Sequence, residues 1–240
     1  GLGDVYKRQI LKKMLIFSLP LMCSSILQLL FNAADVVVVG KFAGDNALAA
    51  VGSNTALINL LTNLFMGLSI GANVVAARYF GAKQKKDLEK TVHTAMLLSM
   101  LSGVLLCVLG LIGAKQMLIW MQTPEEVLSL AALYLRIYFL GMLPSMVYNF
   151  GSALLRAVGD TQRPLIYLLI AGCVNVVFNL IFVIVFHMSV AGVALATVIS
   201  QFLSAGLILR CLMRSENGIH LDLHLSLIHI SEPTRLQLIS

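Results

Sequence analysis

The sequence predicts an all-α membrane protein, built as a bundle of six transmembrane helices. Of its 240 residues, 59% are hydrophobic and only 12% are charged, whereas soluble domains carry about a quarter charged residues. Six stretches hold the roughly 20 mostly apolar residues that a membrane span needs. The basic residues form short clusters between these stretches, so the formal net charge of +6 indicates a lipid bilayer, and no nucleic acid, as the partner.

The six predicted spans follow one another with short polar connections. Pro20 and Pro144 lie inside the first and fourth spans, where a kink is tolerated if neighbouring groups satisfy the freed backbone. Some stretches exceed the thickness of the bilayer core, so tilt or extension beyond the membrane is expected. The spans cover residues 14–39, 47–77, 91–113, 127–152, 164–186 and 190–212.

The charges of the loops predict the orientation, because lysine and arginine concentrate in cytoplasmic loops. Along an alternating six-span path, only Lys41 and Lys115 fall on one side. The N-terminus and the 78–90 and 156–163 loops are therefore expected to be cytoplasmic. The other side carries eleven basic residues: Lys12, Lys13, Arg78, Lys83, Lys85, Lys86, Lys90, Arg156, Arg163, Arg210 and Arg214.

Both ends of the chain resemble translated sequencing-adapter DNA. The codons GAT GTG TAT AAG AGA CAG encode residues 4–9, and their reverse complement, CTG TCT CTT ATA CAC ATC, encodes residues 225–230. This DNA resembles a transposase mosaic-end adapter, and such segments are excluded from fold reasoning. We therefore divide the chain into an artefact at 1–9, a membrane domain at 10–214, a cytoplasmic linker at 215–224 and a second artefact at 225–240. The natural protein is expected to continue beyond both ends.

One acid lies well inside the predicted spans. Asp35 sits late in the first span, and Gln28, Phe31 and Asn32 precede it by seven, four and three residues, so they share its helical face. An ionisable group inside a membrane costs roughly 2.5–3.5 kcal/mol on insertion scales, so it usually has a function. Because burial disfavours the charged form of a carboxyl group, Asp35 is expected to take up a proton or to bind a cation.

Polar residues form stripes on three other spans. Asn175 and Asn179 are four apart on the fifth span, and a longer stripe on the second span includes Asn59. The sixth span carries a stripe with Thr197 and Gln201. Each stripe alone is also explained by hydrogen bonds between helices. Together with one buried acid, they predict a polar, water-filled cavity inside the bundle, with Gln28, Asn32, Asn59 and Gln201 as further lining candidates.

No catalytic arrangement of the soluble type is apparent. His93 and His187 have no partners at metal-ligand spacing, and the chain has no phosphate-binding GxxxxGK[ST] loop. The cysteines lack the paired short spacing of a disulfide framework or zinc site and lie in or beside apolar segments. We interpret them as small core residues, and we predict no enzyme activity and no resident cofactor. They are Cys23, Cys107, Cys173 and Cys211.

Four segments, in order and at the right span boundaries, resemble the multidrug and toxic compound extrusion (MATE) family over about residues 10–213. They are Pro20…Gln28…Asp35-Val-Val-Val-Val-Gly40 with Ala47-Leu-Ala-Ala-Val-Gly52; Gly71-Ala-Asn…Ala76-Ala-Arg-Tyr-Phe-Gly81; Leu155-Arg-Ala-Val-Gly-Asp-Thr-Gln-Arg-Pro164; and Asn175…Asn179 with Ala191-Gly-Val-Ala-Leu-Ala-Thr197.

The resemblance implies a transporter with twelve spans in two six-helix lobes, of which this chain matches the N-terminal lobe. Such proteins sit in the plasma membrane of prokaryotes and export small amphipathic or cationic substrates in exchange for protons or sodium. We expect the lobe to be inactive without its missing C-terminal partner lobe.

The resemblance also implies roles for individual residues. Asp35 matches the coupling acid of the family's first span, and Asn175 and Thr197 match two members of a network around that acid. In one branch of the family the position of Asn179 holds an aspartate. A second carboxylate is therefore absent here, which puts a two-acid proton relay in doubt and leaves H⁺ or Na⁺ coupling to Asp35.

Two alternatives belong to other functional classes. A lipid-linked oligosaccharide flippase of the same superfamily shares the layout, but is expected to carry more cationic residues in its cavity than the central spans provide. An intramembrane enzyme needs a Ser/His or paired-Asp arrangement within the spans, and none can be assembled.

Overall fold

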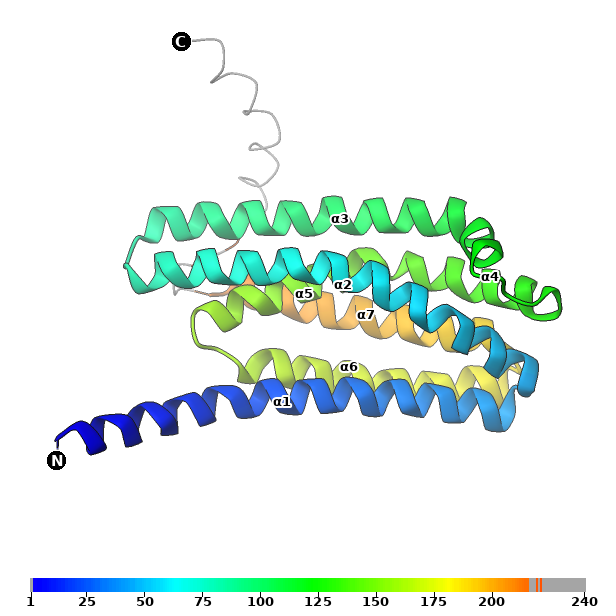
Figure 1. Ribbon diagram of the computed structural model, residues 1–240, viewed down its shortest axis with the longest axis horizontal. Coiled ribbons are helices and arrows are strands. Elements are labelled where there is room, and N and C mark those ends of the chain that lie inside the picture. Colours follow the sequence, from blue (N-terminus) through cyan, green and yellow to red (C-terminus); the bar gives the residue numbers. More distant parts are fainter. Residues whose placement is uncertain (1, 216–218, 220, 222–240) are drawn as a thin grey trace, which may run out of the picture.

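The computed structural model describes residues 2–215, 219 and 221, and the described chain is almost entirely helical. Long helices run side by side, up and down, in a single elongated bundle (Figure 1). In chain order they are α1 (Leu2–Phe42), α2 (Asp45–Gly81), α3 (Lys85–Trp120), α4 (Glu125–Leu140), α5 (Met142–Ala157), α6 (Gln162–Leu180), a π-helical turn η1 (Ile181–Val185) and α7 (Ser189–Met213).

Six spans result when α4 and α5 are taken as one span broken in the middle. Among the residues that the structure describes, five helices are long and apolar enough to cross a membrane, and the α4–α5 pair, bent by 47°, makes a sixth. The helices extend past the predicted apolar limits: the 37 residues of α2 reach about 55 Å at 1.5 Å per residue. The prediction of a six-helix membrane bundle is confirmed.

The break in the fourth span lies at Gly141. Pro144, three residues later, has no N–H to donate to the Leu140 carbonyl, so the helix ladder is interrupted there. A Cβ atom at Gly141 would lie 2.0 Å from Oε1 of Gln201, so a larger residue where α7 crosses the break would displace that side chain. Pro20, in contrast, lies inside the uninterrupted helix α1. The two predicted kink sites therefore differ, because only one has a glycine beside it.

Two apolar cores lie toward opposite ends of the bundle. One joins the end of α1 and the start of α2 to α3, α4 and the start of α7, around Phe139. The other joins the end of α2 and the start of α3 to α5 and the end of α7, around Phe150. We call the end with the second core the basic end, because it holds the 82–84 and 158–161 connections and the start of α1 (Figure 1).

Helix α2 binds both halves of the broken span through two asparagines. Nδ2 of the buried Asn54 donates to the Ala131 carbonyl of α4 at 3.0 Å. Nδ2 of Asn73 donates to the Ala153 carbonyl of α5 at 2.5 Å. In an apolar helix, such interhelical hydrogen bonds satisfy polar side chains that would otherwise lie unpaired. The two bonds fix α4 and α5 against a common support.

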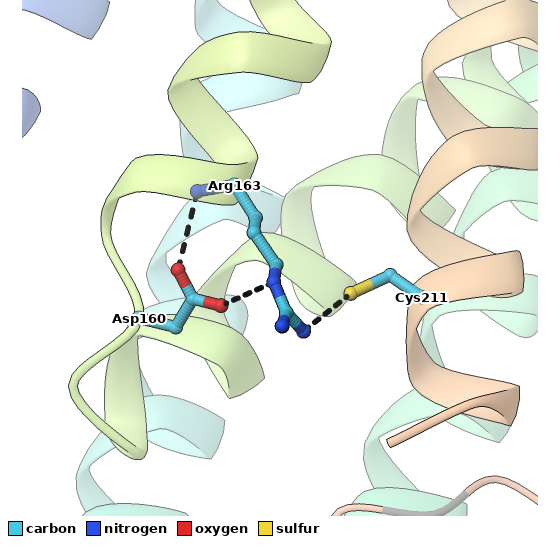
Figure 2. A network of polar contacts seen from close by, with 3 residues as sticks. All are labelled: Asp160, Arg163 and Cys211. Carbon is cyan, nitrogen blue, oxygen red and sulfur yellow. Dashed lines mark hydrogen bonds and ion pairs between the residues drawn. The ribbon is translucent and has the colours of Figure 1, made fainter.

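At the basic end, a polar cluster connects the start of α6 to the end of α7 (Figure 2). Oδ1 of Asp160 accepts from the Arg163 backbone N–H at 3.1 Å, and its Oδ2 lies 3.2 Å from Nε of the same arginine. The guanidinium also contacts the Cys211 sulfur at 3.5 Å. The side chain of Arg163 on α6 thus reaches Cys211 on α7, a residue 48 positions later in the sequence.

The structure corrects the assignment of one cysteine and describes only part of the predicted linker. Cys211 is buried, but Cys173 is exposed, so its assignment as a core residue is wrong. It lies on the outer face of α6, which in a membrane helix is as apolar as the core. Of the predicted linker, Ser215, Ile219 and Leu221 are buried. The rest of the linker and the 225–240 segment lie outside the described residues. The artefact at 1–9 stays a proposal from the DNA relationship.

Substituting Gly110→Ala tests the packing of α3 on the broken span. An added Cβ would lie 1.9 Å from the buried Phe139 ring. We expect the chain in detergent to lose about 1–3 kcal/mol of stability, the usual cost of overpacking a core. Thermal unfolding followed by size-exclusion chromatography measures this.

The matched control is Gly67→Ala, where nothing lies within 4 Å of the added Cβ. The double variant Gly110→Ala with Phe139→Leu should recover part of the loss. An unfolding temperature for Gly110→Ala equal to that of the control would contradict the described α3–α4 contact.

Candidate functional site

A polar cavity of about 290 Å³ opens on the side of the bundle formed by α1, α2, α6 and α7. Its wall also includes the broken span, where α4 meets α5. Asp35 is the only charged residue among those that line it. The predicted stripes of α1, α2, α6 and α7 all contribute: Gln28, Asn32, Asn59, Asn63, Asn175, Thr197, Ser200, Gln201 and Ser204.

Asp35 is held by an amide group from the facing helix. Nδ2 of Asn179 on α6 donates a hydrogen bond to Oδ1 of Asp35 on α1. Asn179 is 1% exposed and therefore has no access to water as an alternative partner. The bond closes a contact between residues 144 positions apart. Asn179 itself stands behind the cavity wall, and Asp35 stands in it.

A second pair connects α6 to α7 within the same wall. Nδ2 of Asn175 donates to Oγ1 of Thr197 at 3.2 Å, and the Thr197 hydroxyl donates to the Val193 carbonyl at 3.0 Å. Asn175 and Asn179 are one helical turn apart, so both amides face the seam between α1, α6 and α7. The structure therefore brings Asp35, Asn175, Asn179 and Thr197 into one cluster.

The cluster contains oxygen atoms without hydrogen-bond donors. Oδ1 of Asn175, Oδ1 of Asn179 and Oε1 of Gln201 are buried and lack a hydrogen-bond partner among the described residues. Buried acceptors of this kind are normally satisfied by protein, water or an ion. Amide and carboxylate oxygens are the ligands that hard cations prefer. The arrangement is chemically suited to a proton on Asp35 or to a cation bound by Asp35 and neutral oxygens.

One carboxylate sets the charge of the cavity wall. In residues 2–215, 219 and 221, no group of three or more His, Cys, Asp or Glu side chains could hold a metal ion. With a single carboxylate facing the cavity, the site offers one negative charge. One charge matches a monovalent cation or a proton.

Sequence reasoning missed the contribution of the broken span. Tyr138 on α4 and Ser145, Tyr148 and Asn149 on α5 also line the cavity. The hydroxyl of Tyr148 donates to the Pro164 carbonyl at 2.9 Å and so orients its ring. Ser145, Tyr148 and Asn149 are spaced by three and four residues, a helical polar stripe that the sequence does carry.

Two local features let α1 and α6 approach each other. The Phe31 ring rests on Gly172, where an added Cβ would lie 1.9 Å from a ring carbon. Just after Asn179, α6 passes into the π-helical turn η1, which begins at Ile181. Such turns appear mostly as single-turn bulges and are frequent at functional sites. The acid's partner therefore stands at an irregular point of its helix.

Comparison with known proteins agrees with this architecture. The family model described as MatE matches residues 20–181. The probable multidrug resistance protein YpnP of Bacillus subtilis is 29% identical over 82% of this chain and 44% of its own length. YoeA, a second probable multidrug resistance protein of that organism, is 29% identical over 90% of this chain and 48% of its own length.

A solved structure matches at the level of the fold as well. The crystal structure of a MATE protein in the bent conformation superposes with a TM-score of 0.83 at 27% identity, over 89% of this chain and 48% of that one. The chain therefore spans about half the length of the relatives it matches, as expected for one lobe of a two-lobe transporter. Because the family model covers more than half of the chain, and relatives and fold agree with it, this chain belongs to the MatE family.

Proposed function

We propose that this chain is the ion-coupling lobe of a secondary exporter of small amphipathic or cationic compounds. The observation that carries the proposal is Asp35, which is the only charged residue lining a polar cavity and is held there by Asn179. The matched relatives that carry the description "multidrug resistance protein" support the substrate class. Export of this kind runs on the exchange of the compound for H⁺ or Na⁺.

The exchange rests on competition for one negative charge. When Asp35 is ionised and free, the cavity attracts a cationic compound. When Asp35 binds a proton or Na⁺, that attraction ends and the compound is released. A ligand shifts a conformational equilibrium only by its differential affinity for the two states. Binding of an ion to Asp35 therefore shifts the two-lobe transporter between its inward-facing and outward-facing conformations.

A lipid-linked oligosaccharide flippase is the second candidate. A pyrophosphate-linked substrate calls for lysine or arginine in the cavity, because these residues recognise phosphate. The lining residues of the described cavity include an aspartate and no lysine or arginine. This polarity favours a cationic or amphipathic compound over an anionic lipid carrier.

The orientation and the missing lobe belong to the same proposal. We infer that the basic end faces the cytoplasm, from the eleven basic residues against two, in the plasma membrane of a prokaryote. The second lobe would close the cavity from the other side. Alone, this chain is expected to bind ions and to transport nothing.

Ion binding by the purified chain tests the role of Asp35. If the site binds Na⁺, we expect Asp35→Asn to weaken Na⁺ binding about tenfold or more, because it removes a charged ligand. If the site binds a proton, we expect the substitution to abolish protonation, because it removes the carboxyl group. Isothermal titration calorimetry measures Na⁺ binding, and the infrared band of the protonated carboxyl group measures protonation. Asp87→Asn, at the basic end and outside the cavity, is the matched control. Unchanged binding and protonation in Asp35→Asn would end the assignment.

Drug export by the full-length protein that contains this lobe tests the transport proposal. In cells lacking their own exporters, we expect it to raise resistance to a cationic dye such as ethidium, and Asp35→Asn to remove that resistance. Thr197→Ala should reduce export less, because it removes two neutral hydrogen bonds, one from Asn175 and one to the Val193 carbonyl, and leaves the charge of Asp35 in place. Ethidium efflux, followed by fluorescence at two Na⁺ concentrations and two pH values, measures both. Full export by Asp35→Asn, with unchanged ion dependence, would contradict the proposal.

A further inference from the structure

A groove outside the cavity lies between α2 and α3 near the basic end, with a volume of about 350 Å³. Its floor is made of small residues, Gly71 and Ala72 on α2 and Ala95 on α3. Its far end is bordered by Leu68 and Leu98, which are 45% and 37% exposed. The central cavity and this groove share no lining residue.

The dimensions of the groove match one leaflet of a bilayer. Along α2 it extends from Tyr79 to Leu68, eleven residues or about 16 Å at 1.5 Å per residue. Half of the hydrocarbon core is about 15 Å thick. Tyr79 and Lys90 mark one end, and Leu68 and Leu98 mark the other, so the groove runs from a polar mouth to an apolar depth.

The hairpin beside the mouth of the groove is positively charged. The hairpin of residues 78–90 carries five basic residues, Arg78, Lys83, Lys85, Lys86 and Lys90. Against Asp87 and Glu89 this leaves a net charge of +3. The N-terminus of the 36-residue helix α3 adds its positive dipole end at Lys85. Lys90 and the half-buried Asp87 both line the groove, so its mouth offers an ammonium and a carboxylate.

We propose that this groove binds an anionic phospholipid of the cytoplasmic leaflet. One acyl chain lies over Gly71 and the flanking alanines, and the phosphate lies at Lys90 under the field of the hairpin. Each lysine near an anionic membrane surface contributes about 1 kcal/mol, so charge selects the headgroup while the groove holds the chain. The basic hairpin then has a second role besides orienting the protein, because it helps to bind one lipid in the groove between α2 and α3.

Native mass spectrometry of the purified 240-residue chain in detergent tests the proposal. The chain is titrated with phosphatidylglycerol, phosphatidylethanolamine or phosphatidylcholine of identical acyl chains. We expect phosphatidylglycerol to bind first, and its preference to shrink as salt rises, because exposed charges are screened. Equal binding of the three lipids would overturn the proposal. A preference for phosphatidylethanolamine would also overturn the proposal, and would indicate that Asp87 binds the ammonium group of that lipid.

Two variants locate the site. Gly71→Leu places a large side chain in the groove at a position where nothing lies within 4 Å of an added Cβ. Lys90→Gln removes the charge at its mouth. We expect Lys90→Gln to weaken phosphatidylglycerol binding about fivefold, the effect of one lysine, and Gly71→Leu to weaken binding of every lipid.

The matched controls are Gly67→Leu, one turn away on α2 with equally open space, and Lys115→Gln at the opposite end of α3. Both should bind phosphatidylglycerol as the unmodified chain does. If Gly71→Leu fails to fold, Lys90→Gln still decides the outcome, because its side chain is exposed. Equal effects of Lys90→Gln and Lys115→Gln would exclude this groove as the site.

Discussion

The contact between Asp35 and Asn179 determines how the rest of the lobe is arranged. An acid inside a membrane costs roughly 2.5–3.5 kcal/mol even on insertion scales, and the amide of Asn179 offsets part of that cost. To make the contact, α1 must lie close to α6, and Phe31 rests on Gly172 one turn before the acid. A larger residue at 172 would push α1 away and separate the pair. The glycine is therefore as much a part of the acid's surroundings as its hydrogen-bond partner.

The two apolar cores and the polar cavity occupy different parts of the bundle. The cores around Phe139 and Phe150 lie toward the ends of the bundle, and the cavity lies on one side between them. The break at Gly141 falls in this middle region, where Tyr138 and Ser145 face the cavity. Asn54 and Asn73 on α2 hold the two halves of the broken span. The helix beside the cavity is thus broken, but both of its halves are hydrogen-bonded to α2.

Periodicity in the sequence predicted the spans and most of the site, because both depend on local spacing. The stripe through Gln28, Asn32 and Asp35 does face the cavity, and Asn175 and Asn179 do share a face. Hydropathy gave spans shorter than the helices α2 and α3, since charged residues such as Arg78 and Lys85 lie outside the apolar run but inside the helix. The Asn179–Asp35 pairing and the crossing of Gln201 over Gly141 join distant residues, which spacing alone does not reveal. Tyr148 was missed because an aromatic residue in a span resembles ordinary membrane packing.

A single carboxylate limits what this lobe can do in exchange. With aspartate at the position of Asn179, two acids would face each other, and one would stay protonated because adjacent carboxylates resist double ionisation. Asparagine there donates to Asp35 without competing for the proton, and its buried Oδ1 has no hydrogen-bond partner among the described residues. Under the proposed function, the lobe therefore carries at most one net charge per cycle. It also discharges fully when that charge is neutralised, so a bound ion leaves no residual attraction for a cationic compound. Full discharge by a single ion makes the release of the compound complete.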